Sequence, residues 1–129
     1  MNNKNTSLTE AEWQVMECLW RNAPVTGHDA CEYLADKMGW NRSTTLTLLR
    51  RLEKKEAVKS GSEGGRKVFS PILGREDAAL RETEDLLSRA YNGSVSLMVS
   101  SLTKKQSLSK REVDELCALL RELEGKNDD

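Results

Sequence analysis

The sequence predicts a mainly α-helical protein in two parts, with a small β-hairpin at the end of the first part. Three observations predict it. Apolar residues recur at the helical spacing i, i+3, i+4, i+7 in several segments, two capping-box sequences mark helix starts, and a glycine-rich turn separates two short β-prone runs. A chain of 129 residues fits one compact domain or two small modules. We place the boundary between residues 1–73 and residues 74–129.

The first helix begins after Thr9, which is followed three residues later by Glu12, the pattern of a capping box. Leu8 precedes the cap and is positioned to pack on Trp13 as a hydrophobic staple. Ala23-Pro24 ends the helix. Its inner face is predicted to carry Trp13, Met16, Leu19 and Trp20.

The second helix is predicted to begin after Thr26 and to run to about Met38, where Gly39 closes it. Its apolar side carries Ala30, Cys31, Leu34 and Met38.

The third helix begins after Asn41 and has two distinct faces. Its core face follows the helical spacing and carries Thr45, Leu48, Leu49 and Leu52. The opposite face is polar and cationic, with Leu46 and Arg51 on its flanks, and it carries Ser43, Thr47, Arg50 and Lys54. Small hydroxyls at the first turn and cations alongside suit a helix that enters a groove of DNA.

Positive charge is concentrated in this part of the chain. Residues 41–67 hold eight of the 20 Lys and Arg residues but three of the 21 Asp and Glu residues, although the whole chain has a net charge of −1. Such a local excess of cations is typical of a surface that binds a polyanion.

A short β-hairpin is predicted next, because Val58 and the pair Val68-Phe69 flank a glycine-rich turn. It carries Lys59, Arg66 and Lys67. Three short helices followed by a basic hairpin is the order of a winged helix-turn-helix domain, in which the third helix enters the major groove and the wing contacts backbone. Either element alone is better explained as a solvated surface, but the two in this order favour DNA binding.

The C-terminal part is predicted to be a helical dimerisation domain. Its three apolar stripes lie in about 55 residues, too few to bury them well, so they are expected to meet a twofold-related copy. Packing back on the first module is the alternative. The stripes are Leu80, Leu87, Ala90 and Tyr91; Val95, Met98, Val99 and Leu102; and Val113, Leu116, Cys117 and Leu120, the last following a capping box at Ser109 and Glu112.

Several segments resemble the penicillinase repressor family, the BlaI/MecI-type regulators that also include the copper-responsive CopY-type repressors. In the first part these are "LTEAEWQVMECLW", "WNRSTTLTLLRRLEKKEAV" and "GRKVFSPI", and "YNGSVSLMVSSL" and "LSKREVDELCALL" resemble the dimerisation segment. The resemblance covers nearly the whole chain. It implies a cytoplasmic transcriptional repressor that binds, as a homodimer, to a palindromic operator with half-sites similar to TACA and TGTA.

The resemblance also implies a set of DNA-binding residues. Ser43 and Thr44 match the family's residues at the start of the recognition helix, Thr47 and Arg51 agree with its pattern, and Leu46 departs from it. Leu46 either touches a thymine methyl or packs against the wing, and the sequence favours neither. We expect Ser43, Thr44 and Thr47 near bases, and the remaining predicted contacts near phosphates are Arg42, Arg50, Arg51, Lys54, Lys59, Arg66 and Lys67.

Family members are regulated by a membrane sensor protease or by a metal. The family's scissile Asn-Phe bond aligns with Ser101-Leu102 here, so cleavage at this place would require a protease with another preference. Metal-responsive members carry paired cysteines, whereas Cys117 stands alone and His28 is the one histidine, so we expect no metal and no cofactor. Cys18, Cys31 and Cys117 are expected to be reduced thiols, with Cys18 outside the main stripe of its helix.

Other classes of function are poorly supported by the sequence. No catalytic motif is present, so an enzyme is not expected. The polar start "MNNKNTSLTE" is unlike a signal peptide, and no apolar run is long enough for membrane insertion. The alternative to a repressor is a protein-interaction adaptor whose basic helix meets an acidic partner. A preference for inverted-repeat DNA over random duplex separates the two.

Overall fold

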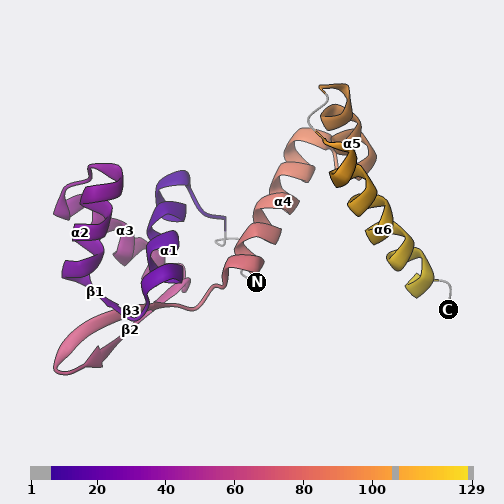
Figure 1. Cartoon of the computed structure of the whole chain (residues 1–129). Coiled ribbons are helices and arrows are strands. Elements are labelled where there is room, and N and C mark those ends of the chain that lie inside the picture. The colour runs from indigo at the N-terminus through magenta and orange to yellow at the C-terminus, as the bar shows by residue number, and fades with distance from the viewer. Residues whose placement is uncertain (1–6, 106–107, 128–129) are drawn as a thin grey trace. The chain divides into compact units, whose positions relative to one another are not determined.

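The structure is a computed structural model that describes residues 7–105 and 108–127. It consists of two compact units, Met1–Asp85 and Leu86–Asp129. The helices and the small sheet follow one another along the chain as Figure 1 shows. The mainly α fold with a β-hairpin wing is confirmed.

The first unit begins with three helices, α1 (Glu10–Asn22), α2 (Gly27–Met38) and α3 (Arg42–Lys54). Their starts are capped as predicted, because the Thr9, Thr26 and Asn41 side chains each accept a backbone N–H from the first turn. Thr9 and Glu12 form the complete capping box. Gly39 closes α2 in the left-handed conformation with φ 74°, where a side chain would be strained.

A three-stranded antiparallel sheet accompanies these helices, with the order β1-β3-β2. β2 (Val58–Glu63) and β3 (Arg66–Pro71) form the predicted hairpin, which projects from the three helices (Figure 1). Its turn uses two glycines with positive φ, Gly64 and Gly65. The strand β1 (Val25–Thr26) was not predicted, and it pairs with β3 so that Val25 opposes Phe69.

One hydrophobic core unites α1, α2, α3 and the sheet. The predicted core face of α3 is buried, and Met16 and Leu19 of α1 and Leu34 of α2 are fully buried against it.

Two sequence-based expectations were wrong. Cys18 is fully buried although it lies outside the predicted stripe, because α1 is covered on more than one side. Met38 is 39% exposed, because residues 35–38 at the end of α2 extend past the core.

The helix α4 (Arg75–Tyr91) begins in the first unit and ends in the second. Ala78 is 3% exposed within the first core, so the first turns of α4 belong with α1–α3. The division between the two units therefore falls later in the chain than the predicted boundary between residues 73 and 74.

The second unit contains the end of α4 and the helices α5 (Val95–Lys104) and α6 (Lys110–Asn127). The hydroxyl of Ser94 caps α5, accepting the N–H of Leu97. The predicted capping box is present at α6, where Ser109 and Glu112 exchange hydrogen bonds. Among the described residues, no helix is long and apolar enough to cross a membrane.

Candidate nucleic-acid interface

The helix α3 presents the two faces predicted from its sequence. Asn41 fixes its start, since the Asn41 Oδ1 accepts the backbone N–H of Thr44 at 2.9 Å. The apolar face is buried, which turns the opposite face toward solvent. The residues exposed there are Ser43, Thr47, Arg50, Arg51 and Lys54, and Thr44 beside them is half-buried.

A groove of about 350 Å³ joins α3 to the wing and to the start of α2. It brings together four of the predicted DNA-binding cations, Arg42 and Arg50 from α3 and Arg66 and Lys67 from β3. Glu53 is the acidic residue in its lining. The β-hairpin and α3 therefore contribute positive charge to the same groove.

A second, more open cavity of about 580 Å³ lies along the outer side of α3. Thr47, Arg51 and Lys54 line it, and Arg50 lines both this cavity and the groove. Positive side chains thus follow α3 from its first turn to its last. Lys59, on the exposed side of β2, lines neither cavity.

These cations are not neutralised by nearby acids. Within residues 7–105 and 108–127, no carboxylate lies within 4.0 Å of the charged groups of the predicted set, which comprises Arg42, Arg50, Arg51, Lys54, Lys59, Arg66 and Lys67. The ammonium of Lys67 instead lies 5.3 Å from the ring centroid of Phe69. Unpaired cations on one surface produce a positive potential that attracts a polyanion.

Leu46 packs inward rather than standing on the exposed face. It is half-buried and contacts the core, and its Cδ2 would lie 3.6 Å from a Cβ added to Gly27. Phe69 of the wing approaches the same position at 3.7 Å. Of the two roles left open by the sequence, packing between α3, the start of α2 and the wing has the better structural support.

An ion pair between the partly exposed Lys55 and the buried Glu12 holds the end of α3 against α1. Lys55, the C-cap of α3, donates to Glu12 Oε1 at 2.6 Å and to the carbonyl oxygen of Ser7 at 3.0 Å. The backbone N–H of Thr9 donates to the same Glu12 oxygen at 2.9 Å, and Glu12 is 1% exposed. Burial raises the pKa of Glu12, but the hydrogen bonds from Lys55 and Thr9 outweigh burial and hold this pKa below its ordinary value of 4.5.

Sequence reasoning explained Glu12 as a capping residue and missed its pairing with Lys55. The two residues are 43 positions apart, and no local pattern links them. One indirect sign was present in the sequence. Lys55 falls outside the exposed face of α3, so it does not belong with the cations predicted to contact DNA. Reasoning also missed Thr26, Gly27 and His28, which line the groove at the start of α2.

One group of possible metal ligands lies beside the groove. His28, Asp29 and Glu32 offer ligand atoms within 4.8 Å of one another, and all three residues are exposed. They stand at the N-terminus of α2, whose dipole disfavours a cation, and His28 shares its groove with Arg42 and Arg50. The helix dipole and the two arginines therefore weaken the attraction of this cluster for a metal ion.

The cysteines offer little reactivity in the first unit. Burial raises the pKa of the Cys18 thiol and that of the Cys31 thiol, which keeps both protonated. Cys31 Sγ donates a weak hydrogen bond to the carbonyl oxygen of Arg42, 3.9 Å away, and so links α2 to the start of α3. Cys117 is exposed on α6.

The predicted dimerisation stripes in α4–α6 are largely open to solvent. Val95, Leu102, Val113, Leu80 and Leu120 are between 38% and 55% exposed. Leu87, Tyr91, Met98, Val99 and Leu116 are half-buried. The stripes omitted four further exposed leucines, Leu86, Leu97, Leu119 and Leu123. Leu116, Leu119, Leu120 and Leu123 repeat as i, i+3, i+4, i+7, so the sequence did contain the signal for two of them.

Comparison with known proteins shows that this chain is similar to repressors. The family model described as Penicillinase repressor matches residues 8–122. The penicillinase repressor of Bacillus licheniformis is 29% identical, over 92% of this chain and 93% of its own.

Two solved structures are similar to the first part of the chain. The DNA-binding domain of the repressor BlaI is 28% identical with a TM-score of 0.52, and the match covers 59% of this chain and 93% of that one. Bacillus licheniformis BlaI, in its monomeric form with the blaP half-operator, is 28% identical with a TM-score of 0.50. That match covers 54% of this chain and 85% of the other. The winged-helix fold is thereby confirmed for the first unit.

Proposed function

The chain belongs to the penicillinase repressor family, and on that premise we propose that it is a sequence-specific DNA-binding transcriptional repressor that acts as a homodimer on a palindromic operator. One observation carries the proposal. The similar BlaI structure holds an operator half-site, and the present chain presents unpaired cations along α3 and the wing of the same fold. A repressor of this kind works in the cytoplasm, where it meets its operator.

Residue roles follow from their places on α3 and the wing. Ser43, Thr44 and Thr47 lie at the first turns of α3, where short hydroxyl side chains let the helix approach base edges. Arg42, Arg50 and Arg66 line the groove between α3 and the wing, where a phosphate would be held from two sides. Arg51 and Lys54 continue this phosphate contact along α3, and Lys59 and Lys67 extend it onto the wing.

Homodimerisation supplies the second half of the operator contact. The exposed leucines of α4–α6 are an apolar surface that a second copy would cover. Two recognition helices related by a twofold axis read an inverted repeat, and their linkage makes the second binding step intramolecular.

Proteolysis in α5 is the proposed route to inactivation. Ser101 is half-buried and Leu102 is 40% exposed, in a helix of ten residues that buries none of its side chains. Such a helix opens at low cost, which gives a protease an extended substrate. Cleavage at Ser101-Leu102 would separate α6 from the rest of the dimer surface. The dimer would be weakened, and with it the binding to the two operator half-sites. A membrane sensor protease is the partner that this route requires.

The experiment that tests the proposal is a selection of bound duplexes from a random DNA pool at near-physiological salt. We expect an inverted repeat to be enriched. Arg50→Ala should weaken binding to all sequences alike and reduce the slope of log affinity against log salt by about one, because one phosphate contact is lost.

Arg21→Ala is the matched control, since Arg21 is an exposed arginine on α1 that lines neither cavity of α3. It should leave the affinity unchanged. A folded dimer that enriches no motif would contradict the proposal and favour an acidic protein partner for the basic helix.

A further inference from the structure

The first turn of α4 is fastened to α1 by one arginine. The guanidinium of Arg75 donates two hydrogen bonds to the carboxylate of Glu17, at 2.8 Å and 2.5 Å. Its Cζ lies 4.8 Å from the ring centroid of Trp20, so the arginine is also stacked on an indole. A bidentate ion pair combined with stacking fixes the orientation of the two side chains as well as the distance between them.

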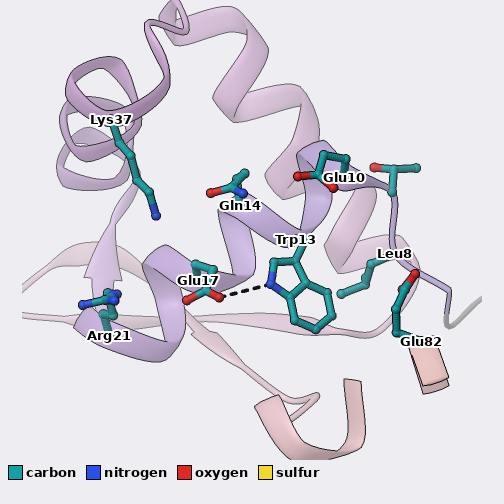
Figure 2. Close-up of a pocket in the computed structure, with 9 residues that line it drawn as sticks. Leu8, Glu10, Trp13, Gln14, Glu17, Arg21, Lys37 and Glu82 are labelled. Carbon is teal, nitrogen blue, oxygen red and sulfur yellow. Dashed lines mark hydrogen bonds between the residues drawn. The ribbon is translucent and has the colours of Figure 1, made fainter. Parts of the chain in front are cut away.

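The partners of Arg75 are themselves held in place. The carboxylate of Glu17 also accepts the indole N–H of Trp13 at 3.1 Å, as the dashed line in Figure 2 shows. Trp13 and Trp20 pack edge to face with centroids 5.3 Å apart. The hydrogen bonds from Arg75 in particular hold the pKa of Glu17 below its ordinary value, so this carboxylate is charged near neutral pH.

A second contact fixes the chain just before α4. The indole N–H of Trp20 donates to the carbonyl oxygen of Leu73 at 2.9 Å, and the backbone N–H groups of Ile72 and Leu73 both donate to the carbonyl oxygen of Ala57. We call Glu17, Trp20, Leu73 and Arg75 the α1–α4 clasp. It holds the chain on both sides of Gly74.

Gly74 is the position at which the chain would otherwise swivel. It lies between the end of β3 and the start of α4, and a Cβ added there would meet open space. Glycine has the widest backbone freedom of any residue, so the backbone at Gly74 does not itself set the direction of α4. The clasp sets that direction together with Ala78, which is buried in the first core, and with the hydrogen bond from the Ser7 hydroxyl to Asp85. Beyond the clasp, α4 continues as a single helix from Arg75 to Tyr91, into the unit with the predicted dimer surface.

We propose that Arg75, Glu17 and Trp20 are positioning residues that set the spacing between operator half-sites. This rests on the proposed function. Because α4 runs unbroken from Arg75 to Tyr91, we expect the direction of its first turns to limit how far apart a dimer can place its two recognition helices. With about 10 to 10.5 base pairs per turn of DNA, each added base pair rotates one half-site by about 35° relative to the other. A rigid α4 would accept few spacings, whereas a chain that swivels at Gly74 would accept several.

The test compares affinities for duplexes that carry a single half-site with affinities for a series of palindromes that differ only in half-site spacing. For the unmodified protein we expect a sharp optimum. Arg75→Ala should lower the affinity at that optimum about tenfold, as preorganisation is lost, and flatten the spacing profile. Its affinity for the single half-site should stay within about twofold, because Arg75 contacts α1 and lines neither cavity along α3.

Two further variants separate the clasp from general stability. Arg75→Lys keeps the charge but loses the two-pronged geometry, and it should flatten the profile to an intermediate degree. Arg89→Ala removes an exposed arginine from the last turn of the same helix and should keep the original profile.

Three outcomes would overturn the inference. An Arg75→Ala protein with the original spacing optimum would show that the clasp does not set spacing. Equal losses on the single half-site and on the palindromes would show that Arg75 only supports folding. If the unmodified protein prefers no palindrome at all, both the proposed function and this inference are contradicted. That result is seen with the unmodified protein alone, before any variant is made.

Discussion

The two units of the chain use the same helical pattern of apolar residues for opposite purposes. In α3, Thr45, Leu48, Leu49 and Leu52 follow the spacing i, i+3, i+4, i+7 and are at most 5% exposed. In α6, Val113, Leu116, Cys117 and Leu120 follow the same spacing, yet Val113 is 38% and Leu120 55% exposed. An apolar stripe therefore predicts that a surface needs cover, but not whether the cover comes from the same chain.

The contrast extends to the whole of each unit. Every buried residue in the described part of the chain lies between Glu12 and Ala78. Nine of the 11 exposed large hydrophobic residues lie on α4, α5 or α6. The first unit has a core that can sustain its own fold, whereas the second gains most of its apolar burial only if a partner covers it.

The largest expected effect concerns the buried face of α3. Leu52→Ala should lower the free energy of unfolding of the first unit by about 3 to 5 kcal/mol, because it leaves a cavity among fully buried side chains. Leu120→Ala makes the same truncation on an exposed leucine and should change that unfolding by less than about 0.5 kcal/mol.

Tryptophan fluorescence during denaturant unfolding distinguishes the two variants, since Trp13, Trp20 and Trp40 all lie in the first unit. Equal losses would mean that the two units share one cooperative core.

The second prediction concerns the surface of α5. Met98→Asp should weaken the dimer at least about 100-fold, because covering an unpaired carboxylate costs about 3 kcal/mol or more. Sedimentation measures the dissociation constant. Ser96→Asp introduces the same charge on an exposed position outside the predicted stripe and should leave the dimer intact. A Met98→Asp protein that stays dimeric would place the interface elsewhere.

The third prediction compares the two capping boxes. Glu12→Gln should lower the free energy of unfolding by about 1 to 3 kcal/mol near pH 7, because Lys55 loses its charged partner in a buried site. Glu112→Gln changes an exposed box and should cost a few tenths of a kcal/mol. Helical circular dichroism during unfolding follows both variants.

The pH dependence of the Glu12 effect has a definite sign. Because the folded protein holds the pKa of Glu12 below 4.5, the unfolded chain takes up this proton more readily. The stability that Glu12 contributes is therefore complete above pH 4.5 and is lost as the pH falls through the folded pKa. A difference between Glu12→Gln and the unmodified protein that persisted undiminished well below that range would contradict this account.

The smallest expected effect comes from the two non-glycine residues with positive φ, one in each unit. Glu56 has φ 64° and Asn92 has φ 50°. Glu56→Gly should raise the stability of the first unit by about 0.5 kcal/mol, since the relief of left-handed strain slightly exceeds the added entropy of the unfolded chain. Asn92→Gly should give no gain, because asparagine tolerates this conformation. Thermal unfolding measures both, and equal gains would contradict the strain argument.

Sequence reasoning predicted the fold best where the signal is local. The starts of α1, α2 and α3 were predicted from Thr9, Thr26 and Asn41, because a cap and the first turn it satisfies lie within four residues of each other. The exposed face of α3 followed from helical spacing alone. The hairpin followed from the glycines between Val58 and Val68, since two-residue turns with positive φ need them.

The features that were missed depend on contacts between distant residues. Val25-Thr26 is too short to read as a strand, and it becomes one only because β3 lies beside it. The pairs Glu12–Lys55 and Glu17–Arg75 join residues more than 40 positions apart. The burial of Cys18 also depends on how many neighbours cover α1, which a single-helix pattern cannot express.

The order β1-β3-β2 leaves β2 at an edge of the sheet, and within the described residues no further strand pairs with it. An open edge is a template on which copies of a chain can polymerise. This edge is a poor template, because five of its six residues are exposed and the strand VKSGSE combines Lys59 and Glu63 with a glycine and two serines. Copies of the chain are therefore not expected to add strand by strand at β2, so this edge should not lead to fibre growth.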